Sequence, residues 1–156
     1  MRFLVLQGPN LNLLGEREPA LYGHQTLAEL QRDLDLHAEK HAVELVHVQS
    51  NHEGVLIDAI HAARGNCAGL IVNAGGYSHT SVALRDALST FSGPIVEVHL
   101  SNLARREPFR QQSLVTAVAT GSVTGLGSLG YRLALDAVVS LTSPQSSRDT
   151  NLARSN

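Results

Sequence analysis

Five short apolar runs alternate with helical patterns along this chain, and that alternation constrains the fold more than any other feature. The runs cover residues 2–7, 43–49, 68–73, 95–99 and 118–124. A strand that is apolar along its whole length is buried on both faces, which is typical of a parallel sheet covered by helices. The helical patterns between the runs supply the crossover connections that parallel strands need.

Right-handed crossovers leave few ways of ordering five parallel strands. We therefore predict an α/β fold of the flavodoxin-like class, a three-layer sandwich with a five-stranded parallel sheet in the order 2-1-3-4-5. The 156 residues fit one domain, which we assign to residues 1–142. Residues 143–156 are polar and rich in serine, and we expect a disordered tail there.

Two of the predicted helices begin with a capping-box pattern. Thr26 and Glu29 precede a helical repeat that reaches about Ala42, and Ser50 and Glu53 precede another that ends at Gly65. Two further helices are predicted over about residues 81–91 and 129–141.

Composition argues against several classes of partner. With 12 basic and 14 acidic residues the formal net charge is −2, which gives no electrostatic footprint for nucleic acid or an anionic membrane. The first apolar run is too short for a signal peptide, and no run approaches the length of a membrane span. Cys67 is the single cysteine, so no internal disulfide can form, and we expect a cytoplasmic protein.

The topology predicts where a functional site should lie. Ligands of such sheets bind outside the carboxyl ends of the strands, at the switch point between the first and third strands. The loops that leave the first, third and fourth strands cover residues 8–24, 74–80 and 100–112, and they hold most of the unusual polar residues. The first loop is long, and loops of that length in compact domains are usually functional or disordered.

Tyr22 and Arg17 in the first loop suggest a general base. A phenol has a pKa of about 10, and bringing it to about 7 requires roughly 4 kcal/mol of differential stabilisation. A cation about 4 Å away at an effective dielectric constant near 20 supplies roughly that amount. Arginine suits this role because it stays charged in any pocket. We therefore interpret Tyr22 as a tyrosinate base activated by Arg17; an ordinary surface pair is the alternative.

His99 and Glu97 suggest the complementary acid. They lie two residues apart at the end of the fourth strand, so their side chains project from the same face. A carboxylate beside an imidazole fixes its tautomer and favours its protonated form. The alternative is a histidine that caps a neighbouring turn.

Other polar residues on the same loops suggest a small substrate. Asn73 ends the third strand before two glycines, and His79 lies just before the next helix. Ser101 and Arg110 add a hydroxyl donor and a cation on the loop that leaves the fourth strand. Together these groups indicate a pocket for a polar, hydroxylated, singly anionic molecule, although each alone could be an ordinary turn or cap residue.

Residues 8–23, GPNLNLLGEREPALYG, resemble the signature of the type II 3-dehydroquinate dehydratases. The resemblance continues through NAGGYSHTSVALRDAL at 73–88, IVEVHLSN at 95–102 and ATGSVTGLGSLGY at 119–131, and it covers about residues 1–141. It implies a flavodoxin-like enzyme that needs no cofactor or metal and converts 3-dehydroquinate to 3-dehydroshikimate with loss of water.

The resemblance also implies a role for individual residues. Tyr22 would remove the proton beside the ketone, with Arg17 keeping it ionised. Asn10 would help to stabilise the enolate through a bound water, and His99, oriented by Glu97, would protonate the departing hydroxyl. The residues that would hold the substrate are Asn73, His79, Leu100, Ser101 and Arg110.

The resemblance further implies a homododecamer built from trimers, in which Asp86 reaches the site of an adjoining subunit. It also bears on the chemistry, because the other known route to this product uses a lysine Schiff base. Lys40 is the single lysine, and it lies near the end of the first helix, far from the predicted site. We therefore exclude the Schiff-base route.

Two other classes of protein share this fold. A non-catalytic module that binds flavin or a small anion remains the alternative, but it would favour a phosphate-binding loop of serine, threonine and glycine where Arg17 and Tyr22 stand. A receiver-type signalling domain would need acidic residues where Gln7 and Asn73 end their strands.

Two further patterns are not interpreted as sites. His37 and His41 have the spacing of helical metal ligands, but they lie at the far end of the first helix, and we expect a solvated face there. Residues 125–130, GLGSLG, match the dinucleotide fingerprint but follow the last strand instead of the first, so no nucleotide is expected.

Overall fold

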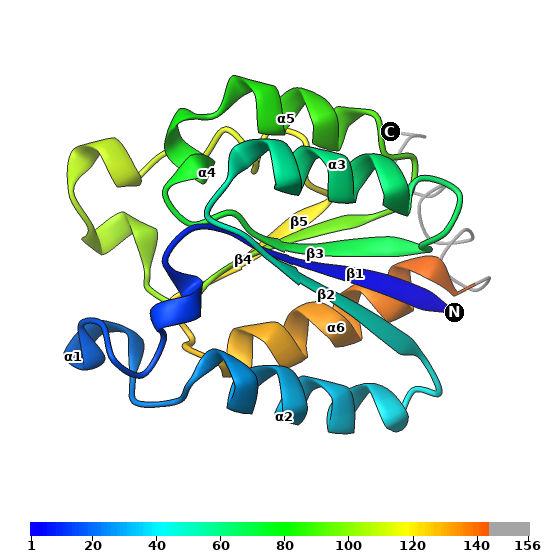
Figure 1. Cartoon of the computed structure of the whole chain (residues 1–156), viewed down its shortest axis with the longest axis horizontal. Helices are drawn as coiled ribbons and strands as arrows, with labels where there is room; N and C mark the ends of the chain where they lie inside the picture. The colour runs from blue at the N-terminus through cyan, green and yellow to red at the C-terminus, as the bar shows by residue number, and fades with distance from the viewer. Residues whose placement is uncertain (144–156) are drawn as a thin grey trace, which may run out of the picture.

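The computed structural model describes residues 1–143, which form a central parallel sheet between two layers of helices (Figure 1). The sheet has the order β2-β1-β3-β4-β5, so the predicted flavodoxin-like arrangement is confirmed. The predicted tail at 143–156 lies outside the described residues apart from Ser143. The strands are β1 (Arg2–Gln7), β2 (Glu44–Gln49), β3 (Gly69–Asn73), β4 (Ile95–His99) and β5 (Gly121–Thr124).

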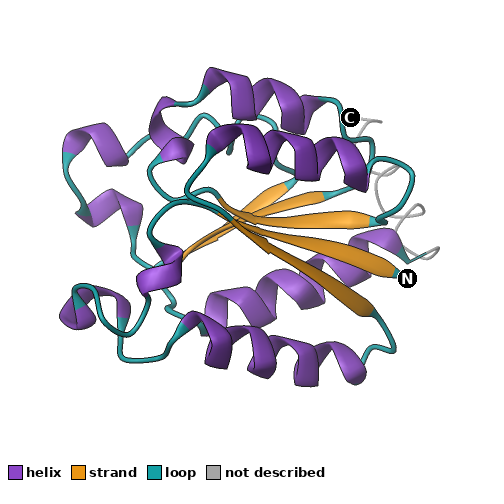
Figure 2. Ribbon diagram, viewed as in Figure 1, coloured by secondary structure: helices purple, strands orange, loops and turns teal. Residues whose placement is uncertain are grey.

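Two pairs of helices cover the two faces of the sheet (Figure 2). The helices α2 (Leu27–Glu39) and α6 (Leu129–Thr142) pack on one face, and α3 (Glu53–Ala63) and α5 (Val82–Ser89) pack on the other. Alternate residues of one strand enter the two cores, because successive strand side chains point to opposite faces. In β1, Phe3 and Val5 pack toward α2 and α6, whereas Leu4 and Leu6 pack toward α3 and α5.

The two predicted capping boxes have different outcomes. The Thr26 hydroxyl accepts a hydrogen bond from the Glu29 backbone amide, and the Glu29 carboxylate accepts one from the Thr26 backbone amide, so the box at α2 is confirmed. The box at α3 was a wrong prediction. Ser50 instead accepts from the backbone of His52 at 3.0 Å, while the Glu53 carboxylate turns away to the hydroxyl of Ser81. The N-cap of α3 is consequently His52, with no side-chain hydrogen bond.

Short helical turns interrupt the predicted loops at the carboxyl edge of the sheet. The first loop contains the 3-10 helix η1 (Leu11–Leu13) and α1 (Pro19–Tyr22), and α4 (Tyr77–Thr80) precedes α5. The fourth loop contains the 3-10 helices η2 (Leu103–Arg105) and η3 (Pro108–Arg110).

The last strand begins later than predicted. The backbone amides of Val118 and Ala119 bond to the carbonyl of Val115 in a turn, so these residues pack beside the core and leave β5 to start at Gly121. Within residues 1–143, no helix is long and apolar enough to cross a membrane.

Candidate active site

A cavity opens at the carboxyl edge of the sheet, where the loops after β1, β3 and β4 meet. Including the solvent at its mouth it encloses about 730 Å³, a size suited to a small molecule. All three loops that the topology predicted contribute to its lining. The predicted site residues in that lining are Asn10, Arg17, Tyr22, Asn73, His79, His99, Leu100, Ser101 and Arg110.

The loops after β1 and β3 approach each other closely at Gly8. Its backbone amide donates to the carbonyl of Asn73 at 2.8 Å, and a Cβ added at Gly8 would lie 2.3 Å from the carbonyl oxygen of Ala74. Only glycine permits that approach. The contact sets the start of the first loop directly against the end of β3.

The first loop then turns through left-handed backbone conformations. Asn10 has a φ of 68° and Glu18 one of 42°, and asparagine is among the few residues that tolerate this region. The backbone amide of Asn10 donates to the Asn51 side chain at 2.9 Å, which anchors the turn to the segment after β2. The amide of Tyr22 bonds to the Glu18 carbonyl at 3.0 Å, so α1 holds Tyr22 at the pocket.

An arginine contacts the Tyr22 hydroxyl, and it is Arg106. Its Nη1 donates to Tyr22 Oη at 3.1 Å and to Ser101 Oγ at 3.0 Å. Partial burial lowers the pKa of Arg106, but the Tyr22 hydroxyl and the Glu107 carboxylate outweigh that effect and leave the pKa raised. Arg17 also lines the pocket, and its Nε lies 3.7 Å from the carboxylate of Glu18.

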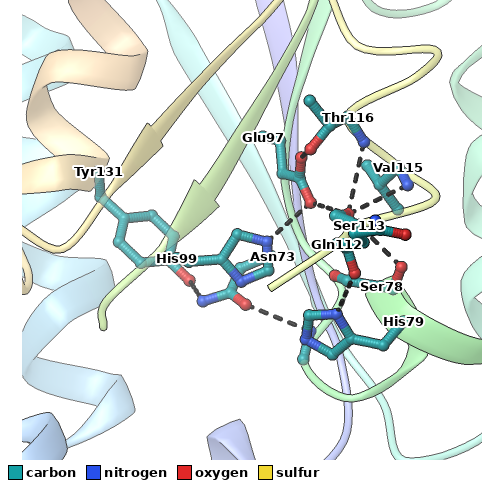
Figure 3. A network of polar contacts seen from close by, with 11 residues as sticks. Asn73, Ser78, His79, Glu97, His99, Gln112, Ser113, Val115, Thr116 and Tyr131 are labelled. Atoms are coloured by element: carbon teal, nitrogen blue, oxygen red, sulfur yellow. Dashed lines mark hydrogen bonds and ion pairs between the residues drawn. The ribbon is translucent and has the colours of Figure 1, made fainter. Parts of the chain in front are cut away.

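Glu97 and His99 form a buried hydrogen-bonded pair at the pocket (Figure 3). Glu97 Oε1 lies 2.7 Å from His99 Nε2, and the hydroxyls of Ser113 and Thr116 also donate to this carboxylate. Burial raises the pKa of Glu97, but the hydrogen bonds from His99, Ser113 and Thr116 outweigh it and leave the pKa below its ordinary value. An ionised carboxylate only accepts, so His99 carries a hydrogen on Nε2 and its Nδ1 is left for a ligand.

His79 and Asn73 are held in fixed orientations beside His99. The Nδ1 of His79 lies 2.7 Å from the Gln112 carbonyl, so Nδ1 carries the hydrogen, and the ring stacks on that of His99 with centroids 6.1 Å apart. The Asn73 amide donates to Tyr131 Oη at 3.0 Å, and its carbonyl accepts from the Gly75 backbone (Figure 3). Burial raises the pKa of Tyr131 to about 12, so this hydroxyl stays protonated.

The remaining predicted residues are not all at the pocket. Arg110 lines it and pairs with Glu107, with Nη1 to Oε1 at 2.9 Å. Glu97 lies under His99 instead of in the lining. Asp86 is exposed on α5, where it pairs with Arg85 at 3.1 Å. The role predicted for Asp86 in an adjoining subunit stays a prediction.

Four residues with contacts at the site were missed by sequence reasoning: Arg106, Ser113, Thr116 and Tyr131. Arg106 stands in the arginine-rich stretch 105–110, from which Arg110 was singled out. Tyr131 follows the glycine-rich segment 125–130 that matched a different fingerprint. Ser113 and Thr116 belong to the site only because they donate hydrogen bonds to Glu97, which lies 16 and 19 residues earlier in the chain. No periodic pattern signals such a contact.

Comparison with known proteins gives one consistent family. The family described as "Dehydroquinase class II" matches residues 1–139. The "3-dehydroquinate dehydratase 2" of Pseudomonas putida is 58% identical over 132 residues, which are 85% of this chain and 89% of that protein. The "3-dehydroquinate dehydratase" of Bacillus subtilis is 53% identical over 133 residues, 85% of this chain and 90% of that protein.

Solved structures agree with that comparison. The type II dehydroquinase from Butyrivibrio crossotus superposes with a TM-score of 0.87 at 41% identity, covering 88% of this chain and 97% of that one. The corresponding protein from Propionibacterium acnes gives a TM-score of 0.86 at 38% identity, covering 89% and 96%.

Proposed function

Because this chain belongs to the class II dehydroquinase family, we propose that its pocket removes water from 3-dehydroquinate to give 3-dehydroshikimate, with Tyr22 as base and His99 as acid. The observation that carries this mechanism is that Tyr22, in contact with an arginine, and His99, in contact with a buried glutamate, line the same cavity. One pocket thereby holds both a candidate acceptor and a candidate donor of a proton.

The first step is removal of the proton beside the ketone by the Tyr22 phenolate. The hydrogen bond from Arg106 supports this assignment, because a guanidinium at hydrogen-bond distance favours the ionised phenol. Arg17 adds a second positive charge in the lining. The electrons of the broken C–H bond form an enolate, and Asn10 contributes to its stabilisation.

The second step is loss of the hydroxyl as water. The proton comes from His99 Nδ1, since Nε2 is bound to Glu97. The electron pair of the enolate forms the carbon–carbon double bond as the carbon–oxygen bond breaks. Tyr22 has then gained one proton and His99 has lost one, and transfer of a proton from Tyr22 to His99 through solvent resets the site. Glu97 stabilises the imidazolium that this role requires.

We assign the other lining residues to binding of the substrate. Asn73 and His79 present polar groups fixed by their own hydrogen bonds. Ser101, Arg110 and the backbone of Leu100 complete the set that we assign to the ring hydroxyls and the carboxylate.

The test is direct. Purified protein is mixed with 3-dehydroquinate in buffer treated with a chelator, and the conjugated product is followed by ultraviolet absorbance. We expect turnover without added cofactor, and absence of turnover would defeat the proposal.

A second experiment separates this mechanism from covalent catalysis. Borohydride added during turnover reduces and traps a Schiff base, but we expect no inactivation and no mass adduct here. Lys40, the single lysine of the chain, directly follows the last turn of α2, away from the pocket. A reduced adduct on Lys40 would contradict the mechanism.

A further inference from the structure

Two histidines and an aspartate converge between α2 and α6, outside the pocket. His37 lies in the last turn of α2, His41 follows that helix, and Asp136 lies on α6. The Nε2 atoms of both histidines lie 2.7 Å from the same oxygen, Oδ1 of Asp136. The two imidazole rings meet edge to face, with centroids 5.3 Å apart.

The expectation that these histidines form a solvated face was wrong. The side chain of His37 is 19% exposed and that of His41 is 30% exposed, because both turn inward to α6. Asp136 is 46% exposed, so water reaches the cluster from one side. The sequence could not reveal the third group, which comes from a helix 95 residues later in the chain.

We propose that His37, His41 and Asp136 form a binding site for a divalent transition-metal ion, Zn²⁺ by preference, which links α2 to α6. Two imidazoles and one carboxylate, with a remaining position open to water, are a ligand set that zinc commonly takes in proteins. All three ligand atoms lie within 4.8 Å of one another. Oxygen-loving ions such as Mg²⁺ are disfavoured because two of the ligands are nitrogen.

The spacing of the ligand atoms needs only a small adjustment. Two ligands about 2.1 Å from a tetrahedral ion lie roughly 3.4 Å apart. The present nitrogen–oxygen separations are 2.7 Å, so each would widen by roughly 0.7 Å for an ion to replace the hydrogen bonds. Asp136, which is 46% exposed, lies on the side of the cluster that water reaches.

A second polar contact joins the same two helices near the cluster. Arg132 Nη2 lies 3.9 Å from Asp33 Oδ2, and these residues precede Asp136 and His37 by four positions each. One helical turn separates the two contacts on both helices. The helices that carry His37 and Asp136 therefore face each other over at least one turn.

The protonation states are compatible with ion binding. Partial burial raises the pKa of Asp136, but hydrogen bonds from His37 and His41 outweigh it, so the pKa is lowered and the carboxylate is charged. In the complex each imidazole gives the Nε2 lone pair to the ion and keeps its hydrogen on Nδ1. The bound ion then faces one full negative charge and two neutral nitrogens.

The cluster and the pocket are separate. The end of α2 lies beside the amino-terminal ends of the strands, at the opposite edge of the sheet from the pocket (Figure 1). An ion here would act as a link between helices and not as a catalytic group. A ligand that binds only the folded state raises the midpoint of thermal unfolding.

The test measures Zn²⁺ binding and thermal unfolding of the full chain. By titration calorimetry we expect one high-affinity Zn²⁺ per chain at this cluster. At free Zn²⁺ about 100 times the measured Kd, Tm should rise by at least about 5 °C over the chelator-treated protein. Co²⁺ in place of Zn²⁺ should give the intense visible absorption of a tetrahedral ion.

Matched variants locate the effect. The double variant His37→Gln with His41→Gln should lose the Tm rise and the Co²⁺ spectrum, and Asp136→Asn should weaken binding at least about 10-fold. His47→Gln is the control, because His47 pairs with Asp35 at 2.8 Å without a third ligand, and it should behave as wild type. Far-ultraviolet circular dichroism checks that each variant is folded.

Two results would overturn the proposal. One is the absence of saturable Zn²⁺ binding to the wild-type chain. The other is an equal Tm rise and Co²⁺ spectrum in the double variant, which would assign the ion to other histidines such as the stacked His79 and His99. In either case the three residues are only a hydrogen-bonded contact between helices.

Discussion

Tyr22 lies in the first loop and His99 at the end of β4, and they have different partners, so their contributions can be separated at the scale of single residues. We expect Tyr22→Phe and His99→Ala each to lower kcat by about 100-fold or more, the usual contribution of a positioned acid or base. Because neither residue is assigned to ground-state binding, KM should change much less. Steady-state kinetics with the ultraviolet assay tests this, and a kcat near wild type in either variant would remove that residue from the mechanism.

Arg106 offers a second residue-scale test through the pH profile. Removing the cation bonded to Tyr22 Oη disfavours the phenolate, so the limb on which kcat/KM rises with pH should move to higher pH in Arg106→Gln. Arg105→Gln removes the same charge from an exposed neighbour and should leave the profile unchanged. Arg17→Gln, at a second cation of the lining, should give a shift in the same direction. If Arg106→Gln and Arg17→Gln kept the wild-type pH profile, as the control Arg105→Gln should, that result would argue against a phenolate base.

Glu97 links catalysis to stability. Its side chain is 0% exposed, and its pKa is lowered in the folded protein. Its stabilising contribution is therefore complete above the ordinary carboxyl range near pH 4 and is lost as pH falls through the lower folded-state value.

Glu97→Gln should consequently cost about 3 kcal/mol of unfolding free energy at pH 7, as expected when a buried carboxylate that accepts from His99, Ser113 and Thr116 loses its charge. The difference from wild type should shrink below about pH 4. Urea unfolding at a series of pH values measures it. A difference that stays constant down to pH 3 would show that the carboxylate charge has no part in stability.

At the scale of elements, the contact between the first and third loops is the feature that shapes the pocket. Gly8→Ala would set a Cβ against the Ala74 carbonyl and force the two loops apart. We expect a loss of stability of about 2 kcal/mol or more and a clear fall in kcat/KM. Gly54→Ala, in α3 with open space around it, is the control and should be neutral or stabilising by up to about 1 kcal/mol. Thermal unfolding and the dehydratase assay distinguish the two.

The two predicted capping boxes show when a local sequence pattern is sufficient to predict local structure. The patterns at Thr26 and Ser50 are alike in sequence, yet only Thr26 forms a capping box. Glu53 has another partner, the hydroxyl of Ser81, which belongs to a different helix. A local pattern predicts local structure only where no distant group competes for the same side chain.

For the whole molecule, the order of the strands followed from the alternation of apolar runs, because chirality leaves few topologies for a parallel sheet. The same topology located the pocket at the carboxyl ends of the strands, where Tyr22 and His99 lie. The partners of those residues could not be predicted in this way. Arg106 reaches Tyr22 across 84 positions and Tyr131 reaches Asn73 across 58, and such contacts depend on how the loops pack.

Assembly is the prediction that belongs to the scale of the whole molecule. Asp86 is exposed on α5 and outside the lining of its own pocket, as a residue serving a neighbouring subunit would be. We expect light scattering to report a dodecamer, and Asp86→Ala to reduce activity. A monomer with full activity would contradict a site shared between subunits.

The tyrosines of this chain give it a simple intrinsic fluorescence. It has three tyrosines and no tryptophan, so all of its near-ultraviolet emission comes from three known positions. Tyr22 lines the cavity, the hydroxyl of Tyr131 bonds to Asn73, and that of Tyr77 bonds to the backbone of Asn51, whose side chain anchors Asn10. Because Tyr22 lines the cavity, we expect ligand binding to change this intrinsic fluorescence, so that ligands can be screened against the unlabelled chain.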